Sequence, residues 1–153
     1  NSTAKNMRDM YFTNSGKDMK EFVEYVDHPL FHACWDTGHG NMEGSQYEEI
    51  MALGKELYAV HINDNQEKTD AHIIPYMGTL SMDEVMCALI DSNYKGYFTM
   101  EAGSVFTNIL SKRRAYERDT RLRTPQLFMQ KSMTNFMYDT CKYILESYDC
   151  FEE

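Results

Sequence analysis

The sequence predicts an α/β domain in which parallel strands are covered by helices. Three short apolar runs have the length of buried strands: LFHACW at 30–35, LYAVHI at 57–62 and YFTM at 97–100. A segment with apolar residues at helical spacing precedes each run, so a helix and a strand recur about every 30 residues. Continuous apolar strands are typical of parallel sheets buried on both faces, and no run alternates as an exposed antiparallel strand would.

The first helix is predicted to begin after Ser15, which can cap it, and Asp18 is an acidic residue in its first turn. Its apolar positions lie at helical spacing, at Met19, Phe22, Val23 and Val26. The segment Asp27-His28-Pro29 should end this helix, because the residue before a proline disfavours the helical conformation. The first strand, 30–35, then leads to Asp36.

The segment after Asp36 is expected to be a tight loop, because it contains Gly38 and Gly40. Ser45 can cap a second helix that ends at Gly54. The inner face of that helix is expected to carry Tyr47, Ile50 and Met51.

A polar loop is expected between the second strand and the third helix, from Asn63 to about Leu80. Ser81 and Glu84 have the spacing of a capping box, which predicts the start of the third helix. The apolar face of this helix is expected to carry Val85, Met86, Leu89 and Ile90.

The C-terminal third differs from this pattern. Residues 111–123 are densely charged, and Thr124-Pro125 is a favourable helix start because proline suits the first turn. Apolar residues then follow at roughly helical spacing, which predicts a long terminal helix that packs against the rest: Phe128, Met133, Phe136, Met137, Cys141, Ile144, Leu145 and Tyr148. Without a linker or low-complexity segment, we expect one domain, 1–153, with a helical extension at 106–153.

The composition excludes several function classes. The chain has 153 residues and a formal net charge of −9, which disfavours nucleic acid as a partner. No apolar stretch approaches the roughly 20 residues that span a bilayer, so no membrane partner is expected. The four cysteines form no CxxC pair, which favours reduced thiols in a cytoplasmic protein.

Groups that can bind a metal ion occur at each predicted strand end. Carboxyl ends of parallel strands meet at one side of a sheet, so these groups should converge. Taken singly, each residue is weak evidence for a metal site, since a strand-terminal aspartate often caps a helix and a histidine in a strand is usually a core residue. We assign such structural roles to His28 and His32. Mixed nitrogen and oxygen ligands suit Zn²⁺ or Mn²⁺. The candidate metal ligands are Asp36, His39, His61, Asp70, His72 and Glu101.

Four segments together resemble the xylose isomerase-like (β/α)₈ TIM barrels: WDTGHGN, VHINDN, DAHIIPYMGTLSMDEVMCAL and GYFTMEA. The resemblance implies that residues 1–105 form roughly the C-terminal half of such a barrel. It also implies that Asp36, His61 and Glu101 match the family's metal ligands. The other three, His39, Asp70 and His72, match groups found in members with several metal ions.

The implied activity is that of a sugar or sugar phosphate isomerase or epimerase, which moves a proton through a metal-stabilised enediolate. Glu101 would act as acid or base, and His39 would hold a second metal or contact the substrate. The cofactor would be Mn²⁺, Zn²⁺ or Mg²⁺, and no other cofactor-binding residue is expected.

Two departures from the family accompany this resemblance. The family has a glutamate ligand, usually followed by asparagine, at the end of the preceding strand, so this glutamate is expected upstream of Asn1. The isolated chain is therefore expected to lack full isomerase activity. Tyr76 stands where many members have glycine, which should reshape that loop.

Two alternative functions remain open. One is a zinc phosphodiesterase of the endonuclease IV type, whose basic contact surface would be sought in 112–123. The other is an inactive half-barrel that pairs with its missing N-terminal half or with a second copy, because a half-barrel has two open sheet edges.

Overall fold

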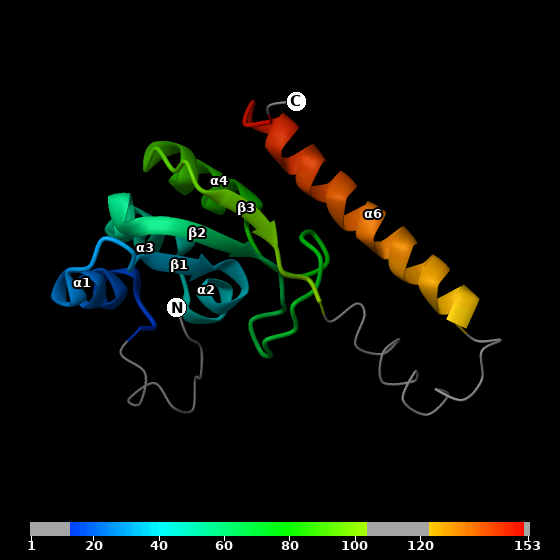
Figure 1. Ribbon diagram of the computed structural model, residues 1–153, viewed down its shortest axis with the longest axis horizontal. Helices are drawn as coiled ribbons and strands as arrows, with labels where there is room; N and C mark the ends of the chain where they lie inside the picture. Colours follow the sequence, from blue (N-terminus) through cyan, green and yellow to red (C-terminus); the bar gives the residue numbers. More distant parts are fainter. Residues whose placement is uncertain (1–12, 104–122, 152–153) are drawn as a thin grey trace.

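The structure is a computed structural model that describes residues 13–103 and 123–151. Three strands form one parallel sheet in the order β1-β2-β3 (Figure 1). The elements in chain order are α1 (Gly16–Val26), β1 (Ala33–Asp36), α2 (Thr37–Glu43), α3 (Gln46–Leu53), the 3₁₀ turn η2 (Gly54–Glu56), β2 (Leu57–Ile62), α4 (Met82–Asp91), β3 (Tyr97–Met100) and α6 (Arg123–Ser147).

The predicted parallel α/β order is confirmed, and β2 and β3 have the predicted bounds. The first strand begins at Ala33 and not at Leu30. A turn occupies 28–31, because the Phe31 N–H donates to the His28 carbonyl at 2.9 Å, and it leaves Leu30 exposed. The basic run at 112–122 lies outside the described residues.

The segment after β1 is a helix, α2, and the expectation of a loop was wrong. Asp36 caps this helix by accepting a hydrogen bond from the His39 N–H at 2.9 Å. The glycines serve packing instead of a turn: a Cβ at Gly40 would lie 2.6 Å from Gln46 Oε1 and 2.7 Å from the Trp35 ring.

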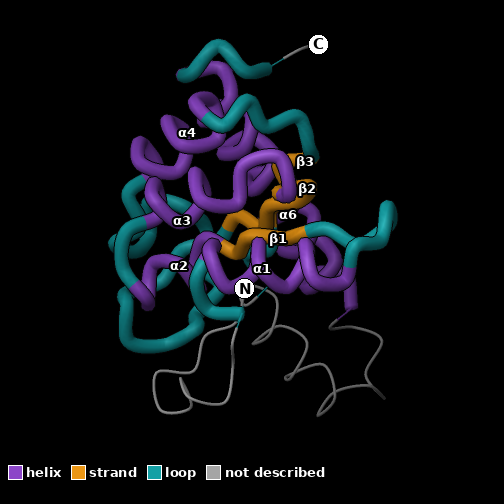
Figure 2. Tube along the Cα trace, turned by 90° about the vertical axis from the view of Figure 1, so that its left-hand side faces the viewer, coloured by secondary structure: helices purple, strands orange, loops and turns teal. Residues whose placement is uncertain are grey.

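Helices α1, α3 and α4 cover one face of the sheet, and α3 and α4 lie on one side of the strands in Figure 2. The fully buried side chains Trp35, Val60 and Ile62 project from the sheet toward this layer. The core between the layers is completed by Met19, Val23, Ile50, Leu53, Val85, Met86 and Leu89.

Two residues expected on inner faces, Met51 and Ile90, are largely exposed, at 37% and 47%. Each lies one position after a buried residue, Ile50 and Leu89 respectively. Successive residues on a helix point about 100° apart, so Met51 and Ile90 lie beyond the edge of the face that Ile50 and Leu89 occupy.

Helix α6 packs on the rest of the fold through its C-terminal end. Ile144 is fully buried there, and the Tyr148 hydroxyl donates to Asp83 of α4. Phe136, which was expected to pack, is 44% exposed, because the helix runs away from the sheet layer in its first half (Figure 1). Within the described residues, no helix is both long enough and apolar enough to cross a bilayer.

Candidate metal centre

Parallel pairing brings the ends of the three strands to one edge of the sheet. Asp36, the last residue of β1, is the register partner of His61 in β2. Glu101 directly follows β3, and its N–H donates to the Ile62 carbonyl at 2.9 Å, which extends the ladder by one bond. The three side chains that share this edge come from positions separated by 25 and 40 residues along the chain (36 to 61, 61 to 101).

Asp36, His61 and Glu101 form the first donor group. Each offers a ligand atom, and these three atoms lie within 4.8 Å of one another. The closest pair is His61 Nδ1 and Glu101 Oε2, 2.8 Å apart. Carboxylate oxygens and an imidazole nitrogen in such proximity match the ligands that Zn²⁺ and Mn²⁺ take from proteins.

A second donor group adjoins the first and shares Asp36. It comprises Asp36, His39 and His72, again with ligand atoms within 4.8 Å of one another. Asp70 bridges its two imidazoles: Asp70 Oδ2 lies 3.2 Å from His39 Nε2, and Asp70 Oδ1 lies 2.9 Å from His72 Nε2. All six candidate residues thus lie in one continuous cluster at the carboxyl ends of the strands.

The remaining histidines lie elsewhere. His28 is exposed, and its Nδ1 accepts a hydrogen bond from the Leu30 N–H at 3.2 Å. The His32 ring stacks on Tyr58 with centroids 3.5 Å apart, and its Nε2 is 3.1 Å from the Pro29 carbonyl. Neither belongs to the two donor groups.

Burial alone would raise the pKa of Asp36, whose side chain is nearly inaccessible. The hydrogen bond from the His39 N–H, the charge of the His39 ring and the Asn63 amide outweigh it, and they hold this pKa below its ordinary value. Asp36 therefore remains an anion in the buried wall of the cluster, where an anion can attract a cation.

The pKa of His72 is shifted upward, in the opposite direction to that of Asp36. Burial alone would lower its pKa, but the hydrogen bond to the Glu101 carbonyl and the carboxylates of Asp70 and Asp36 raise it above its ordinary value. Its Nδ1 is 3.0 Å from that carbonyl, so both ring nitrogens face oxygen acceptors. A cation at Nε2 would have to displace the proton that these acceptors favour.

A buried polar network, which the sequence analysis did not identify as functional, supports the cluster. Asn63, Asp64 and Asn65 directly follow β2 and are all fully buried. Asp64 accepts hydrogen bonds from the Gly78 and Leu80 N–H groups at 2.8 and 3.0 Å. It also pairs with Ile73 through two backbone hydrogen bonds. These bonds fold back the loop that carries Asp70 and His72.

Asn65 connects α2 to the same loop. Its Nδ2 donates to the Gly38 carbonyl at 2.7 Å, and its Oδ1 accepts from Asn41 Nδ2 at 3.0 Å. Three polar residues in a row after an apolar strand, Asn63-Asp64-Asn65, are the sequence signal that could have identified this network, because buried polar groups must be paired.

Tyr76, in the same loop, has a φ of 72°, in the left-handed region that glycine favours. The loop thus keeps a glycine-like backbone at this position and carries a tyrosine ring in addition. That ring packs edge-on against Tyr143 of α6, with centroids 6.2 Å apart.

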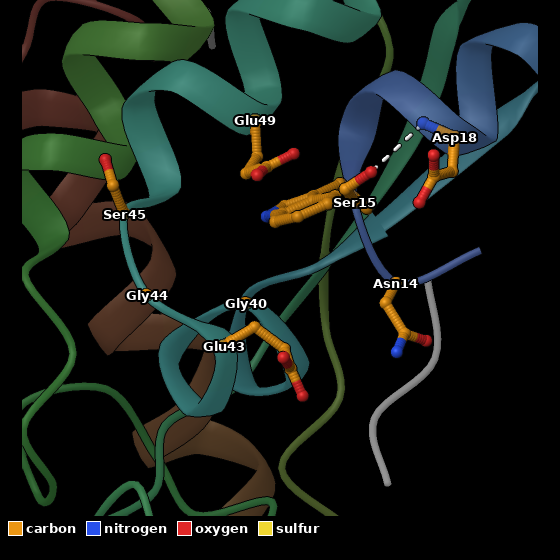
Figure 3. Close-up of a pocket in the computed structure, with 9 residues that line it drawn as sticks. Asn14, Ser15, Asp18, Gly40, Glu43, Gly44, Ser45 and Glu49 are labelled. Carbon is orange, nitrogen blue, oxygen red and sulfur yellow. Dashed lines mark hydrogen bonds between the residues drawn. The ribbon is translucent and has the colours of Figure 1, made fainter. Parts of the chain in front are cut away.

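A separate pocket of about 250 Å³ lies on the other side of β1. Trp35 lines it, and successive strand residues point to opposite faces, so this pocket faces away from Asp36. Figure 3 shows Asp18, Glu43 and Glu49 around it. Glu49 accepts a hydrogen bond from the Gly16 N–H at the start of α1. None of the six cluster residues lines this pocket.

The family model of the xylose isomerase-like TIM barrel matches residues 4–122, more than three quarters of the chain. The chain belongs to the xylose isomerase-like TIM barrel family. In TIM barrels the active site lies at the carboxyl ends of the strands, and the cluster of Asp36, His61 and Glu101 occupies that end of the sheet. The predicted fold class, part of a TIM barrel, is confirmed.

Among curated proteins, the chain is similar to fructoselysine 3-epimerase of Escherichia coli O157:H7, with 37% identity over 79 residues. Among solved structures, it is similar to D-psicose 3-epimerase of Clostridium cellulolyticum H10, with 28% identity and a TM-score of 0.54 over 62% of this chain. It is also similar to D-allulose 3-epimerase of Methylomonas sp., with 25% identity and a TM-score of 0.53 over 59% of this chain.

Each of these similarities covers only part of this chain and part of the relative. They cover 48% of this chain and 29% of the fructoselysine 3-epimerase, and 32% and 30% of the D-psicose and D-allulose 3-epimerase chains. The chain therefore spans less than a third of the length of these relatives.

Proposed function

We propose that this chain supplies part of the active site of a divalent-metal-dependent sugar isomerase or epimerase, in which Asp36, His61 and Glu101 hold the cation. The supporting observation is the convergence of their ligand atoms to within 4.8 Å. Ligands about 2.0–2.2 Å from one ion lie at most about 4.4 Å apart, so a slight contraction of this group would fit Mn²⁺, Zn²⁺ or Mg²⁺.

The reaction class is inferred from the relatives, which are named 3-epimerases of fructoselysine, D-psicose and D-allulose. We extend to this chain the proton transfer next to a carbonyl of a small sugar. We propose a sugar as the small-molecule partner. A phosphorylated sugar would need a basic contact, and the basic run at 112–122 lies outside the described residues.

Removing a proton from carbon is difficult because the carbon acid is weak. A bound divalent cation would supply Lewis-acid polarisation of the neighbouring carbonyl. Glu101 is the proposed proton acceptor and donor, since its carboxylate is 42% exposed at the rim of the cluster and lies beside His61. His39, held at the Asp70 carboxylate, is proposed to bind a substrate hydroxyl or a second cation.

The face of the sheet that carries His61 is open at β3. On this face, Tyr97 is 85% exposed, and Thr99, the register partner of His61, is also exposed. Because the chain spans less than a third of these epimerases, we propose that the isolated chain binds the cation but does not turn over the sugar. A further part of the barrel, or a second copy, would cover this face. A cytoplasmic location is also proposed, because the four cysteines have neither a CxxC pair nor the spacing of a disulfide framework.

The experiment measures Mn²⁺ binding to the purified chain by calorimetry, with elemental analysis of bound metal. We expect saturable binding, and His61→Ala should weaken it at least about tenfold because one ligand is lost. His28→Ala is the matched control, since His28 is exposed and outside the donor groups. Absence of binding to the unsubstituted chain, or an equal loss in His28→Ala, would refute the metal site.

A second candidate, zinc-dependent phosphodiester hydrolysis, is supported by the second donor group of Asp36, His39 and His72. Two adjoining groups can hold two or more metal ions, which clamp a phosphodiester from both sides. Incubation with zinc and abasic-site DNA distinguishes the two functions. Strand nicking would favour the phosphodiesterase, whereas absence of nicking by a chain that binds zinc would favour the epimerase.

A further inference from the structure

Asn63 lies directly behind the Asp36 carboxylate and is fully buried. Its side-chain Nδ2 donates to Asp36 Oδ1 at 3.0 Å. Its backbone is fixed at the start of α2: the Asn63 N–H donates to Thr37 Oγ1 at 3.0 Å, and the Thr37 hydroxyl donates to the Asn63 carbonyl at 2.7 Å. The amide therefore approaches Asp36 from a backbone that cannot easily shift.

The nitrogen and the oxygen of this side-chain amide differ in their hydrogen bonding. Its NH₂ group has a carboxylate acceptor, whereas its Oδ1 is buried without a hydrogen-bond partner among the described residues. Burying an unpaired carbonyl oxygen costs free energy, and an apolar residue of the same shape avoids this cost. The presence of an asparagine at position 63 is therefore explained by its Nδ2 group, which donates to Asp36.

Gly38 leaves the space that this amide needs. A Cβ added at Gly38 would lie 1.9 Å from Asn63 Oδ1 and 2.9 Å from Asn63 Cγ. Any larger residue would have to turn the amide away from its place. The glycine in the first turn of α2 and the amide after β2 are therefore sterically coupled.

We propose that Asn63 is a positioning residue of the candidate metal centre, and that the space left by Gly38 keeps its amide in place. Asp36 Oδ1 accepts from both the Asn63 amide and the His39 N–H, at 3.0 and 2.9 Å. These two bonds restrict the rotation of the carboxylate, whose other oxygen, Oδ2, lies 4.0 Å from His39 Nδ1. The inference rests on the proposed function, because it requires that Asp36 bind a divalent ion.

The test compares Mn²⁺ affinity, by calorimetry on the full chain, between the unsubstituted protein and Asn63→Leu. Leucine is close in shape but has no donor, so the Asp36 carboxylate can rotate, and we expect affinity to fall about 10- to 100-fold. Gly38→Ala should produce a loss in the same range with every donor still present. If Asn63→Leu does not fold, as judged by circular dichroism, Gly38→Ala decides the question.

Gln46→Leu is the matched control. The side-chain amide of Gln46 is also buried. It accepts from Trp35 Nε1 at 2.9 Å and donates to the Thr37 carbonyl at 2.7 Å, and neither of these partners is a cluster residue. We expect its Mn²⁺ affinity to stay within about threefold. The visible absorption of bound Co²⁺ is the second readout, and it should change in Asn63→Leu but not in Gln46→Leu, because only the former removes a hydrogen bond that orients the Asp36 carboxylate.

The proposed metal site and the role of Asn63 can fail separately. If the unsubstituted chain binds no Mn²⁺ or Co²⁺, the proposed function fails, and this inference fails with it. If the unsubstituted chain binds and folded Asn63→Leu or Gly38→Ala binds within threefold of it, only the role of Asn63 is refuted. An equal loss in Gln46→Leu would also refute it, since the effect would then be general loss of a buried amide.

Discussion

Glu84 caps a helix other than its own, and neutralising it gives the sharpest stability prediction. Its Oε1 accepts hydrogen bonds from the Ser45 hydroxyl at 2.7 Å, the Gln46 N–H at 2.8 Å and the Tyr47 N–H at 3.1 Å. Ser45 itself makes no side-chain cap bond to α3. One carboxylate on α4 thus accepts hydrogen bonds from two N–H groups in the first turn of α3, and it joins the two helices.

The expected magnitude comes from these contacts. Loss of an N-terminal cap costs about 0.5–2 kcal/mol, and a negative charge at a helix N-terminus contributes about 0.3–1 kcal/mol. Glu84→Gln keeps an acceptor oxygen but loses the charge, and solvent screens this partly exposed site. We therefore expect the free energy of unfolding to fall by about 1 kcal/mol for Glu84→Gln and about 2 kcal/mol for Glu84→Ala.

The pH dependence has a definite sign. Burial alone would raise the pKa of Glu84, but the bonds from Ser45 and the two N–H groups lower it below its ordinary value of 4.5. A lowered folded-state pKa stabilises the fold above the unfolded-state value. The stabilisation is therefore complete at pH 7 and is lost as the pH falls through the folded-state pKa.

Urea unfolding followed by circular dichroism, at pH 7 and at pH 3.5, measures this difference. Glu48→Gln is the matched control, since Glu48 is an exposed acid in the first turn of the same helix. It should cost about 0.5 kcal/mol or less. Equal losses in Glu84→Gln and Glu48→Gln at pH 7, or a Glu84→Gln difference that is no smaller at pH 3.5 than at pH 7, would refute the reasoning.

Three further predictions follow from the same structure. Asp64→Ala leaves the part-buried Gly78 N–H and the buried Leu80 N–H without their acceptor, so it should cost about 2–4 kcal/mol and increase protease cleavage within 65–80. Ile50→Ala removes a fully buried core side chain and should cost about 2–5 kcal/mol in urea unfolding, with an unchanged m value. His72 has a raised pKa, so in EDTA its contribution is present below about pH 6.5 and is lost as the pH rises through the folded-state pKa; the stability difference from His72→Gln should therefore be larger at pH 6 than at pH 8.5.

Each of these three has a distinct contrary result. Unchanged proteolysis in Asp64→Ala would show that other contacts hold the loop. A cost below about 1 kcal/mol for Ile50→Ala would mean that the core collapses around the lost side chain. A stability difference for His72→Gln that grows with pH would mean that the neutral ring, and not the charged one, is the stabilising form.

The sequence determined the bounds of β2 and β3 and the parallel α/β arrangement, because those depend on local pattern. The runs 57–62 and 97–100 became β2 and β3 with no change of bounds. The six candidate residues could be named because a parallel sheet brings its strand ends to one edge, whatever the details of packing. Helix α2 was missed because two glycines, Gly38 and Gly40, are typical of a loop. Only the folded chain explains them: Gly38 leaves room for Asn63, and Gly40 leaves room for Gln46 and Trp35.

The local sequence pattern could not predict the hydrogen-bond partner of a side chain that can reach several groups. Glu84 has the spacing of a capping box with Ser81, yet its carboxylate pairs with the start of α3, because packing of α4 on α3 presents three donors there. Asn63 reads as an ordinary loop residue, and only the folded chain aims its amide at Asp36. The sequence by itself thus determined which groups reach the edge of the sheet. Tertiary structure decided their hydrogen bonds, since distances of about 3 Å between residues far apart in the chain arise only when helices and strands have packed.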